Sequence, residues 1–193
     1  MKDTMSYSRR PDTALLLVDV INSFYDPGHA NYYPEVEETL PALASLRDAA
    51  RARDALLVHV VERHYRGLDD YEFAKLPRHH QDGARDAAFF PGFEPVDRDR
   101  EIVVPKRRYS GFYATDLDLL LREQRITRVV VAGVKTNVCI RATVQDAFAG
   151  GFDVVVPREA TNSNRPHLAE ASLEDIGRYF GRVVPLAEAE EML

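Results

Sequence analysis

The chain has 193 residues, a mass of 21.8 kDa and 45% hydrophobic residues, which is enough to bury one substantial core, so residues 1–193 are interpreted as a single domain. A formal net charge of −6 at pH 7 argues against a nucleic-acid partner, and the apolar runs are too short for a membrane span or a secretory signal. Because a single cysteine cannot form an internal disulfide, the composition is typical of a cytoplasmic protein.

Short apolar runs rich in Val and Leu recur along the chain, and the first of them, TALLLVD, is closed by a charge. Continuous apolar runs of this length are typical of strands that are buried on both faces of a parallel sheet. The sequence therefore predicts six strands, at residues 13–19, 56–61, 101–104, 128–132, 153–156 and 182–184.

Most segments between these runs have the spacing of amphipathic helices, which are predicted at residues 34–53, 116–124, 137–149 and 166–180. The first of them opens with Pro and acidic residues and ends with arginines, which suits the helix macrodipole. Strands that alternate with helices pair in parallel through right-handed crossovers. The predicted fold is therefore α/β, a three-layer α/β/α sandwich with a mainly parallel six-stranded sheet.

The segment at residues 62–100 interrupts this alternation because it is long, polar and aromatic. A connection of that length inside a compact domain is usually disordered, a lid or a binding loop. Its aromatic content favours a lid or pocket loop. The alternative is an irregular surface excursion packed by its own aromatic residues, Phe89, Phe90 and Phe93.

Chemistry-bearing residues follow three of the predicted strands, at the sheet edge where open α/β folds bind ligands. They are Asp19, Lys106 and Cys139. Taken singly, each residue has an ordinary interpretation: Asp19 as a turn cap, Lys106 as a solvated charge and Cys139 as a residue that fills the core. Together, a helix N-terminus and the ammonium lower the pKa of a cysteine, a carboxylate moves its proton, and backbone N–H groups at residues 135–139 hold an oxyanion.

Three stretches also resemble a known family, and they read LLLVDVINSFY, VVPKRRYSGFYATDLDLLL and VVVAGVKTNVCIRATVQDAFAGGFDVVV. They resemble the isochorismatase-like cysteine hydrolases, the superfamily of nicotinamidase, N-carbamoylsarcosine amidase and ureidoacrylate amidohydrolase. The resemblance implies an Asp19, Lys106 and Cys139 triad. It also implies a cis peptide between Val134 and Lys135, an oxyanion hole formed by the N–H groups of Lys135 and Cys139, and a homodimer or homotetramer.

The walls of the pocket are expected to come from residues close to the triad, and the predicted substrate-binding residues are Phe24, Glu62, His64, Tyr109, Phe112 and Asn137. The two aromatic residues of the YSGF stretch are equally compatible with wall packing, and Glu62 with a surface acid. Arg107 and Arg108 suit a substrate carboxylate, or else an exposed charge or intersubunit salt bridge. The sequence leaves open whether the Lys135 side chain points into the pocket.

No metal and no cofactor are expected. Nicotinamidases bind a metal through an Asp-x-His pattern with further histidines in the loop after the second strand. This chain has Glu62-Arg63-His64 and the pair His79-His80, but no Asp-x-His.

The function that the sequence and the resemblance favour is a cysteine-dependent amidohydrolase, which cleaves a C–N bond of a small amide, ureide or carbamoyl compound through a thioester. One alternative is hydrolysis of a vinyl ether as in isochorismatase, which needs no nucleophilic cysteine. Another is a non-catalytic binding protein on the same fold. In each case the partner is a small molecule, not nucleic acid or a membrane.

Overall fold

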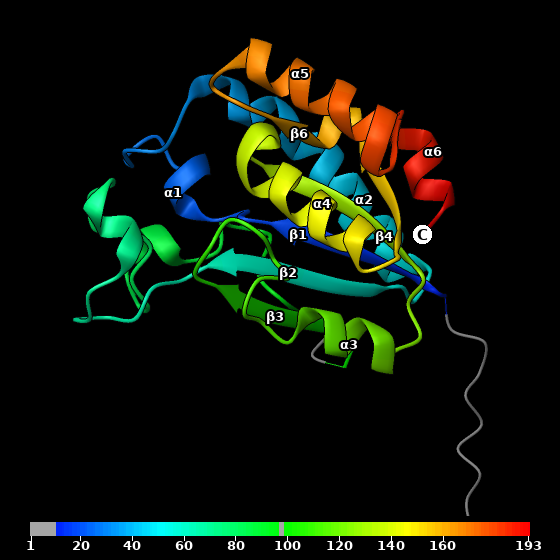
Figure 1. Cartoon of the computed structure of the whole chain (residues 1–193), viewed down its shortest axis with the longest axis horizontal. Coiled ribbons are helices and arrows are strands. Elements are labelled where there is room, and N and C mark those ends of the chain that lie inside the picture. Colours follow the sequence, from blue (N-terminus) through cyan, green and yellow to red (C-terminus); the bar gives the residue numbers. More distant parts are fainter. Residues whose placement is uncertain (1–10, 97–98) are drawn as a thin grey trace, which may run out of the picture.

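The computed structural model describes residues 11–96 and 99–193, and within these ranges seven parallel strands form one sheet (Figure 1). The strand order is β3-β2-β1-β4-β5-β7, with β6 paired to the end of β4. The six predicted strands are confirmed, and the additional β6 is only two residues long, too short to give an apolar pattern. The strands are β1 (Thr13–Val18), β2 (Leu56–Glu62), β3 (Glu101–Lys106), β4 (Arg128–Val134), β5 (Asp153–Pro157), β6 (Thr161–Asn162) and β7 (Arg182–Val184).

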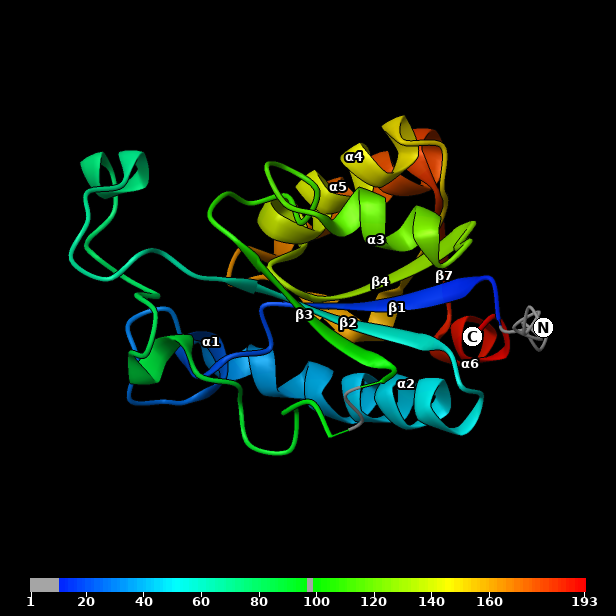
Figure 2. The ribbon, with the colours of Figure 1, turned by 90° about the horizontal axis from the view of Figure 1, so that it is seen from below.

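Helices cover both faces of the sheet, so the predicted three-layer architecture is confirmed (Figure 2). One face is covered by α2 (Leu40–Ala52) and α6 (Leu186–Glu191). The opposite face is covered by α3 (Leu117–Glu123), α4 (Arg141–Ala149) and α5 (Pro166–Asp175).

The central strand β1 shows why the strands of this sheet are continuous apolar runs and do not alternate apolar with polar residues. Leu15 and Leu17 belong to the core on the side of α2, whereas Leu16 and Val18 belong to the core on the side of α3 and α4. All six residues of β1 are buried. Because both faces exclude water, polar side chains have no favourable position along this strand.

Several predicted helices begin or end with a turn that is tighter or wider than an α-helical turn. Cys139 itself lies in a π-helical turn that leads directly into α4. None of the helices in the described ranges is both long and apolar enough to span a bilayer. The short helical segments are α1 (Asn22–Tyr25), η1 (Pro34–Thr39), η2 (Tyr71–Ala74), η3 (Arg85–Ala87), η4 (Thr136–Ile140), η5 (Arg158–Ala160) and η6 (Ile176–Phe180).

The order of the strands fixes where a ligand is expected to bind. The chain runs outward from β1 through β2 to β3, and then returns to place β4 on the other side of β1. The strand order therefore reverses between β1 and β4. In open α/β sheets the crevice beyond the carboxyl ends of the strands at such a point is the usual ligand site.

The segment at residues 62–100 leaves β2 at that same carboxyl edge, and part of it extends beyond the sheet (Figure 1). Residues 97 and 98 lie outside the described residues. Phe93 is buried in the core on the α2 side, and Phe89 and Phe90 pack against the same core. These rings therefore anchor the segment to the domain instead of packing only with one another.

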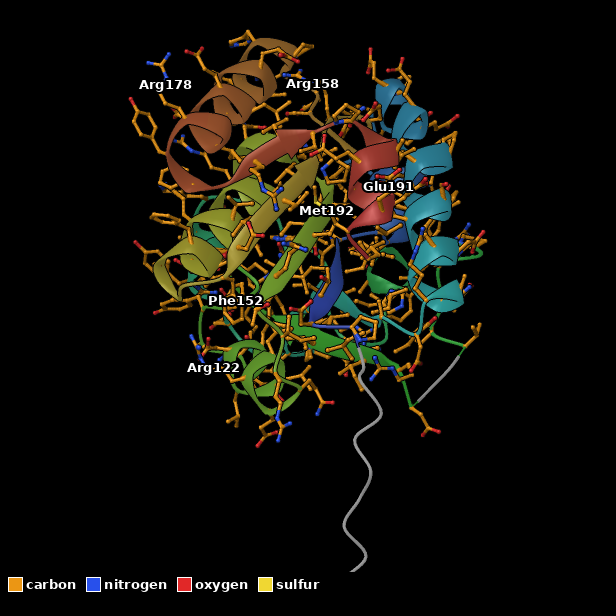
Figure 3. All side chains as sticks on the ribbon, turned by 90° about the vertical axis from the view of Figure 1, so that its right-hand side faces the viewer. Arg122, Phe152, Arg158, Arg178, Glu191 and Met192 are labelled. Atoms are coloured by element: carbon orange, nitrogen blue, oxygen red, sulfur yellow. The ribbon has the colours of Figure 1, made fainter. Side chains whose placement is uncertain are left out.

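The opposite edge of the sheet carries the amino ends of the strands and is viewed in Figure 3. There the guanidinium of Arg122 lies 5.0 Å from the centre of the Phe152 ring, and the two labelled side chains are adjacent (Figure 3). The contact packs α3 against the turn before β5 at this edge.

Candidate active site

The carboxyl ends of β1, β3 and β4 bring the three predicted catalytic residues together. Lys106 Nζ lies 2.9 Å from Asp19 Oδ2 and 3.5 Å from Cys139 Sγ. The exposed fractions are 0% for Asp19, 1% for Lys106 and 4% for Cys139. The predicted clustering is therefore confirmed, and the interpretations of Lys106 as a solvated charge and of Asp19 as a turn cap are wrong.

Asp19 is held from two directions where β1 ends. Its N–H donates to Val60 O at 2.8 Å, and its Oδ1 accepts from the N–H of Glu62 at 2.7 Å. The residue has φ 55, a left-handed conformation that Asp tolerates better than most residues. These contacts with β2 fix the carboxylate so that Oδ2 faces Lys106.

Lys106 is the last residue of β3 and lies in register with Glu62 of β2. Burial alone would lower the pKa of its ammonium. The negative charges of Asp19, Cys139 and Glu62 outweigh burial and raise that pKa above its ordinary value. Lys106 is therefore a permanent cation at the bottom of the site.

Cys139 lies in the η4 turn, and burial raises the pKa of its thiol well above the ordinary value. The Lys106 charge lowers this pKa, whereas the charges of Asp19 and Glu62 raise it further. The lowered thiol pKa expected from the sequence is therefore wrong for the free protein, because the depth of burial outweighs the cation. A proton acceptor is close, since an oxygen of Asp19 and Cys139 Sγ lie within 4.8 Å of each other.

The backbone before Cys139 has the predicted cis peptide between Val134 and Lys135. Lys135 O accepts hydrogen bonds from the N–H groups of Val138 and Ile140, at 3.0 and 3.2 Å. In the described part of the chain, the Lys135 N–H itself donates no backbone hydrogen bond. This N–H is therefore free to bind an oxygen of a ligand.

Glu62 is the charge centre beside the triad. It is buried, and its carboxylate contacts Lys106 Nζ at 3.4 Å, His79 Nε2 at 2.9 Å, His80 Nδ1 at 3.1 Å and His64 Nε2 at 3.3 Å. Burial alone would raise the Glu62 pKa, but the Lys106 charge and the three histidines hold it well below the usual range. Glu62 is an anion in the site and not the surface acid that the sequence left open.

Four donor groups next to the triad lie within 4.8 Å of one another, and this loop cluster consists of Glu62, His64, Glu72 and His79. Nδ1 of His64 contacts Asp70 at 3.1 Å, and Nδ1 of His79 contacts Pro77 O at 2.7 Å, so that both Nε2 atoms face inward. Glu72 is buried, and neither carboxylate oxygen has a hydrogen bond within the described residues.

Histidines held at one nitrogen by a carboxylate or a carbonyl, with the other nitrogen beside carboxylates, are the donor arrangement of zinc sites. The loop cluster therefore fits a divalent cation. The Asp-x-His pattern is missing because Glu62 stands where that Asp is expected. Glu72 and His79 join the cluster only through the path of the loop. The absence of a metal stays a prediction.

A cavity of about 580 Å³ opens above Cys139. Its lining includes residues from the stretches 23–31, 76–86 and 135–139 together with Glu62 and Tyr109. This volume is in the range of small-molecule sites. Of the predicted substrate-binding residues, the structure places Phe24, Glu62 and Tyr109 in the lining.

Three predicted substrate-binding residues lie elsewhere. Phe112 packs on the α3 and α4 side with its ring 5.8 Å from that of Phe152, so its assignment to the pocket is wrong. His64 is buried in contact with Glu62, and the buried side-chain oxygen of Asn137 has no hydrogen-bond partner among the described residues. Neither His64 nor Asn137 belongs to the cavity lining.

The two arginines after Lys106 also lie outside the lining. Arg108 pairs with Asp70 at 2.9 Å, and the Arg107 guanidinium lies 4.8 Å from the ring centre of Tyr65. Sequence reasoning instead missed lining residues whose positions depend on the loops, among them Ser23, His29, Asn31, Arg78 and Arg85.

Comparison with known proteins agrees with this arrangement. A family model described as the isochorismatase domain matches residues 13–188. The chain belongs to the isochorismatase family. The family resemblance seen in the three sequence stretches is thereby confirmed.

Individual isochorismatase-family relatives cover nearly the whole chain. N-carbamoylsarcosine amidase from Arthrobacter sp is 31% identical over 191 residues, which cover 94% of this chain and 70% of that protein. Maleamate amidohydrolase from Pseudomonas putida is 33% identical over 194 residues, which cover 98% and 89%. The crystal structure of an isochorismatase-like hydrolase from Alkaliphilus metalliredigens has a TM-score of 0.86 and 34% identity, covering 93% of this chain and 97% of that chain.

Proposed function

We propose that the protein is a cysteine-dependent amidohydrolase that cleaves a C–N bond of a small amide, ureide or carbamoyl compound. The observation that carries the proposal is the contact of one buried ammonium, that of Lys106, with both Asp19 and Cys139 beneath a cavity. Relatives in the family are named as an amidase and an amidohydrolase, which is consistent with a hydrolase that acts on C–N bonds other than peptide bonds.

In the first half of the reaction, Cys139 Sγ attacks the carbonyl carbon of the substrate while its proton passes to the Asp19 carboxylate. The C–N bond then breaks, and the proton on Asp19 moves to the departing nitrogen, which leaves as ammonia or an amine. The acyl group remains on Cys139 as a thioester. Burial raises the pKa of the Cys139 thiol, which is consistent with transfer of its proton to Asp19 during the attack.

In the second half, a water molecule gives a proton to Asp19 and attacks the thioester carbonyl. The C–S bond breaks, the proton returns to sulfur, and the carboxylic acid product leaves. Lys106 keeps Asp19 oriented and its positive charge stabilises the sulfur anion that each half-reaction passes through.

Negative charge also develops on the carbonyl oxygen in both halves. The N–H groups of Lys135 and Cys139 are proposed to bind this oxygen, and the free Lys135 N–H supports that role. Preorganised backbone donors of this kind are typically worth about 10²- to 10³-fold in turnover.

The loop cluster is also a candidate site for a metal ion. A divalent cation bound by Glu62, His64, Glu72 and His79 would supply fixed positive charge and Lewis acidity at the cavity wall beside the triad. The steps proposed above take their nucleophile from Cys139 and their proton acceptor from Asp19. Glu62 contacts Lys106 in the structure and keeps this contact with or without a bound cation.

The loop at residues 62–100 is proposed to act as the pocket loop that selects the substrate. It contributes Leu76, Pro77 and Arg78 to one wall of the cavity, followed by the His79-His80 pair. The path of this loop therefore contributes to the shape of the cavity that Cys139 also lines.

A panel of small amides, ureides and carbamoyl compounds tests this function. Release of ammonia or an amine from at least one member by wild-type protein, with no release by Cys139→Ser, is the expected result. Cleavage of a vinyl ether such as isochorismate that survives in Cys139→Ser would support the first alternative. Tight binding of a panel member without turnover would support the binding protein.

A further inference from the structure

A chain of hydrogen bonds joins Ser23, His80 and Glu62 in the wall of the cavity. Ser23 Oγ lies 2.6 Å from His80 Nε2, and His80 Nδ1 lies 3.1 Å from Glu62 Oε1. All three residues belong to the lining, and Ser23 and His80 each have an exposed fraction of 2%. The steps proposed for Cys139 use neither Ser23 nor His80.

The carboxylate of Glu62 sets the direction of these hydrogen bonds. Glu62 is an anion and can only accept, so the hydrogen of the neutral His80 ring is assigned to Nδ1, which faces Glu62. The other ring nitrogen, Nε2, then carries a free lone pair. His80 Nε2 therefore accepts the hydroxyl hydrogen of Ser23.

Both the imidazole and the hydroxyl are held by further contacts. The N–H of His80 donates to Asp86 Oδ2 at 2.8 Å, and the carbonyl oxygen of His80 accepts from the N–H of His64 at 2.8 Å. Asn31 Nδ2 donates to Ser23 Oγ at 2.9 Å. The serine and the imidazole are therefore oriented before a ligand binds.

This order of groups is the one that activates serine in hydrolases. A serine hydroxyl alone is a weak nucleophile, and it becomes a strong one when a histidine takes its proton and a carboxylate holds the other ring nitrogen. Here α1 supplies the serine, the pocket loop supplies the histidine and β2 supplies the carboxylate. Such a triad is recognised by its geometry and not by the order of its members in the chain.

We infer that Ser23, His80 and Glu62 form a second nucleophilic site in the cavity, which cleaves small carboxylic esters without the help of Cys139. The inference goes beyond the proposed function, because it assigns another nucleophile and another class of substrate. An amide has a poorer leaving group than an ester, so turnover of amides is still expected to need Cys139.

The proposed steps balance with only an ester and water as reactants. Ser23 Oγ attacks the carbonyl carbon while its proton moves to His80 Nε2. The C–O bond to the alcohol breaks, and the alcohol leaves with that proton. Water then gives a proton to His80 and attacks the acyl group on Ser23, and the proton returns to Ser23 as the carboxylic acid leaves.

The ammonium of Lys135 supplies positive charge to the same cavity. Lys135 belongs to the lining, and its Nζ lies 5.7 Å from the ring centre of Phe24, the residue after Ser23. The side chain therefore points into the pocket, a question that the sequence left open. A cation in the lining favours the oxyanion that forms when Ser23 attacks a carbonyl.

Hydrolysis of 4-nitrophenyl acetate by Cys139→Ala protein tests the inference, because this variant has no thiol. Ser23→Ala and His80→Asn are each added to it. Asparagine removes the imidazole but tolerates the left-handed backbone of His80, which has φ 45. The matched control is Ser45→Ala, since Ser45 is exposed on α2 and lies outside the lining.

A cation in the loop cluster would share Glu62 with His80, so all proteins are first dialysed against a chelator. Cys139→Ala should release 4-nitrophenol faster than buffer does. Adding Ser23→Ala or His80→Asn should lower the rate by about 10²-fold or more, and adding Ser45→Ala should not change it. No hydrolysis above buffer by folded Cys139→Ala protein, or a rate that Ser23→Ala leaves unchanged, would overturn the inference.

A covalent label gives a second result that does not depend on any variant of Ser23. An alkyl fluorophosphonate forms a P–O bond to an activated serine as fluoride leaves, and the serine proton passes to the histidine. Peptide mass analysis of labelled Cys139→Ala protein should place the adduct on Ser23 and not on Ser45. If Ser23 only ties α1 to the pocket loop, it will remain unlabelled, and the inference is then wrong while amide hydrolysis by Cys139 is untouched.

Discussion

The ammonium of Lys106 and the carboxylate of Asp19 form an ion pair of 2.9 Å in which both side chains have no exposed surface. Two strands that are not neighbours in the sheet, β3 and β1, supply the two charges, and β2 lies between them. Taking both charges out of water is expensive, so a pair of this kind is weak evidence for stability. Its position beside the only cysteine of the sequence favours a role in catalysis over a role in stability.

The first prediction concerns this ion pair. Asp19→Asn keeps the shape of the side chain but removes its charge, so the proton of Cys139 loses its acceptor. Turnover should fall by about 10²- to 10⁴-fold, the range associated with a general acid or base. Steady-state kinetics with the best substrate of the amide panel measures the effect.

Asp118→Asn is the matched control, because Asp118 pairs with Arg122 on the exposed surface of α3. This variant should retain wild-type turnover. If a folded Asp19→Asn protein turned over within about threefold of the control, Asp19 would have no part in proton transfer.

The second prediction concerns the backbone that brings β4 to the site. Gly133 has φ 117, and a Cβ atom there would lie 2.0 Å from Val18 O of the neighbouring strand. Gly133→Ala should therefore lower the free energy of unfolding by about 3 kcal/mol or more, because rigid backbone atoms cannot move away. Denaturant unfolding measures the change.

Gly151 offers the comparison, since it has φ 82 but no atom of residues 11–96 or 99–193 lies within 4 Å of the added Cβ. Gly151→Ala should cost only about 1 to 2 kcal/mol, the cost of the left-handed conformation alone. Equal losses in the two variants would show that crowding against Val18 is unimportant.

The third prediction concerns the loop cluster. Turnover should persist after dialysis against a chelator, because the proposed steps depend on Cys139 and Asp19. Metal analysis of the dialysed protein accompanies the assay. Activity that disappears on chelation and returns with zinc or iron, but does not return in Glu72→Gln, would instead make the loop cluster a metal centre of the reaction.

The sheet and the triad could be predicted because the rules that govern them are visible in the sequence. Strands buried on both faces give continuous apolar runs, and the residues that follow such runs in a parallel sheet lie at one edge. Asp19, Lys106 and Cys139 were found in this way. The two-residue β6 was missed because it is too short to have a pattern.

The rest of the site depends on quantities that the sequence does not display. The pKa of Cys139 is set by its depth of burial, which outweighs the charge of Lys106. Phe112 was misplaced because the irregular turn after β3 sends its ring to the α4 side, while Tyr109 stays in the lining. Glu72 joined the site only through the folded path of its loop.

The measurement that tests the central claim most directly is the turnover of Cys139→Ser on the best amide of the panel. Serine keeps nearly the same size, but its hydroxyl has a far higher pKa than a thiol, so Asp19 cannot accept its proton readily. The account predicts a folded variant whose turnover is lower by several orders of magnitude, and an acyl adduct on wild-type Cys139 by intact mass when the thioester accumulates. A folded Cys139→Ser protein that retains more than about a tenth of wild-type turnover would contradict it, because loss of a nucleophile costs far more than that.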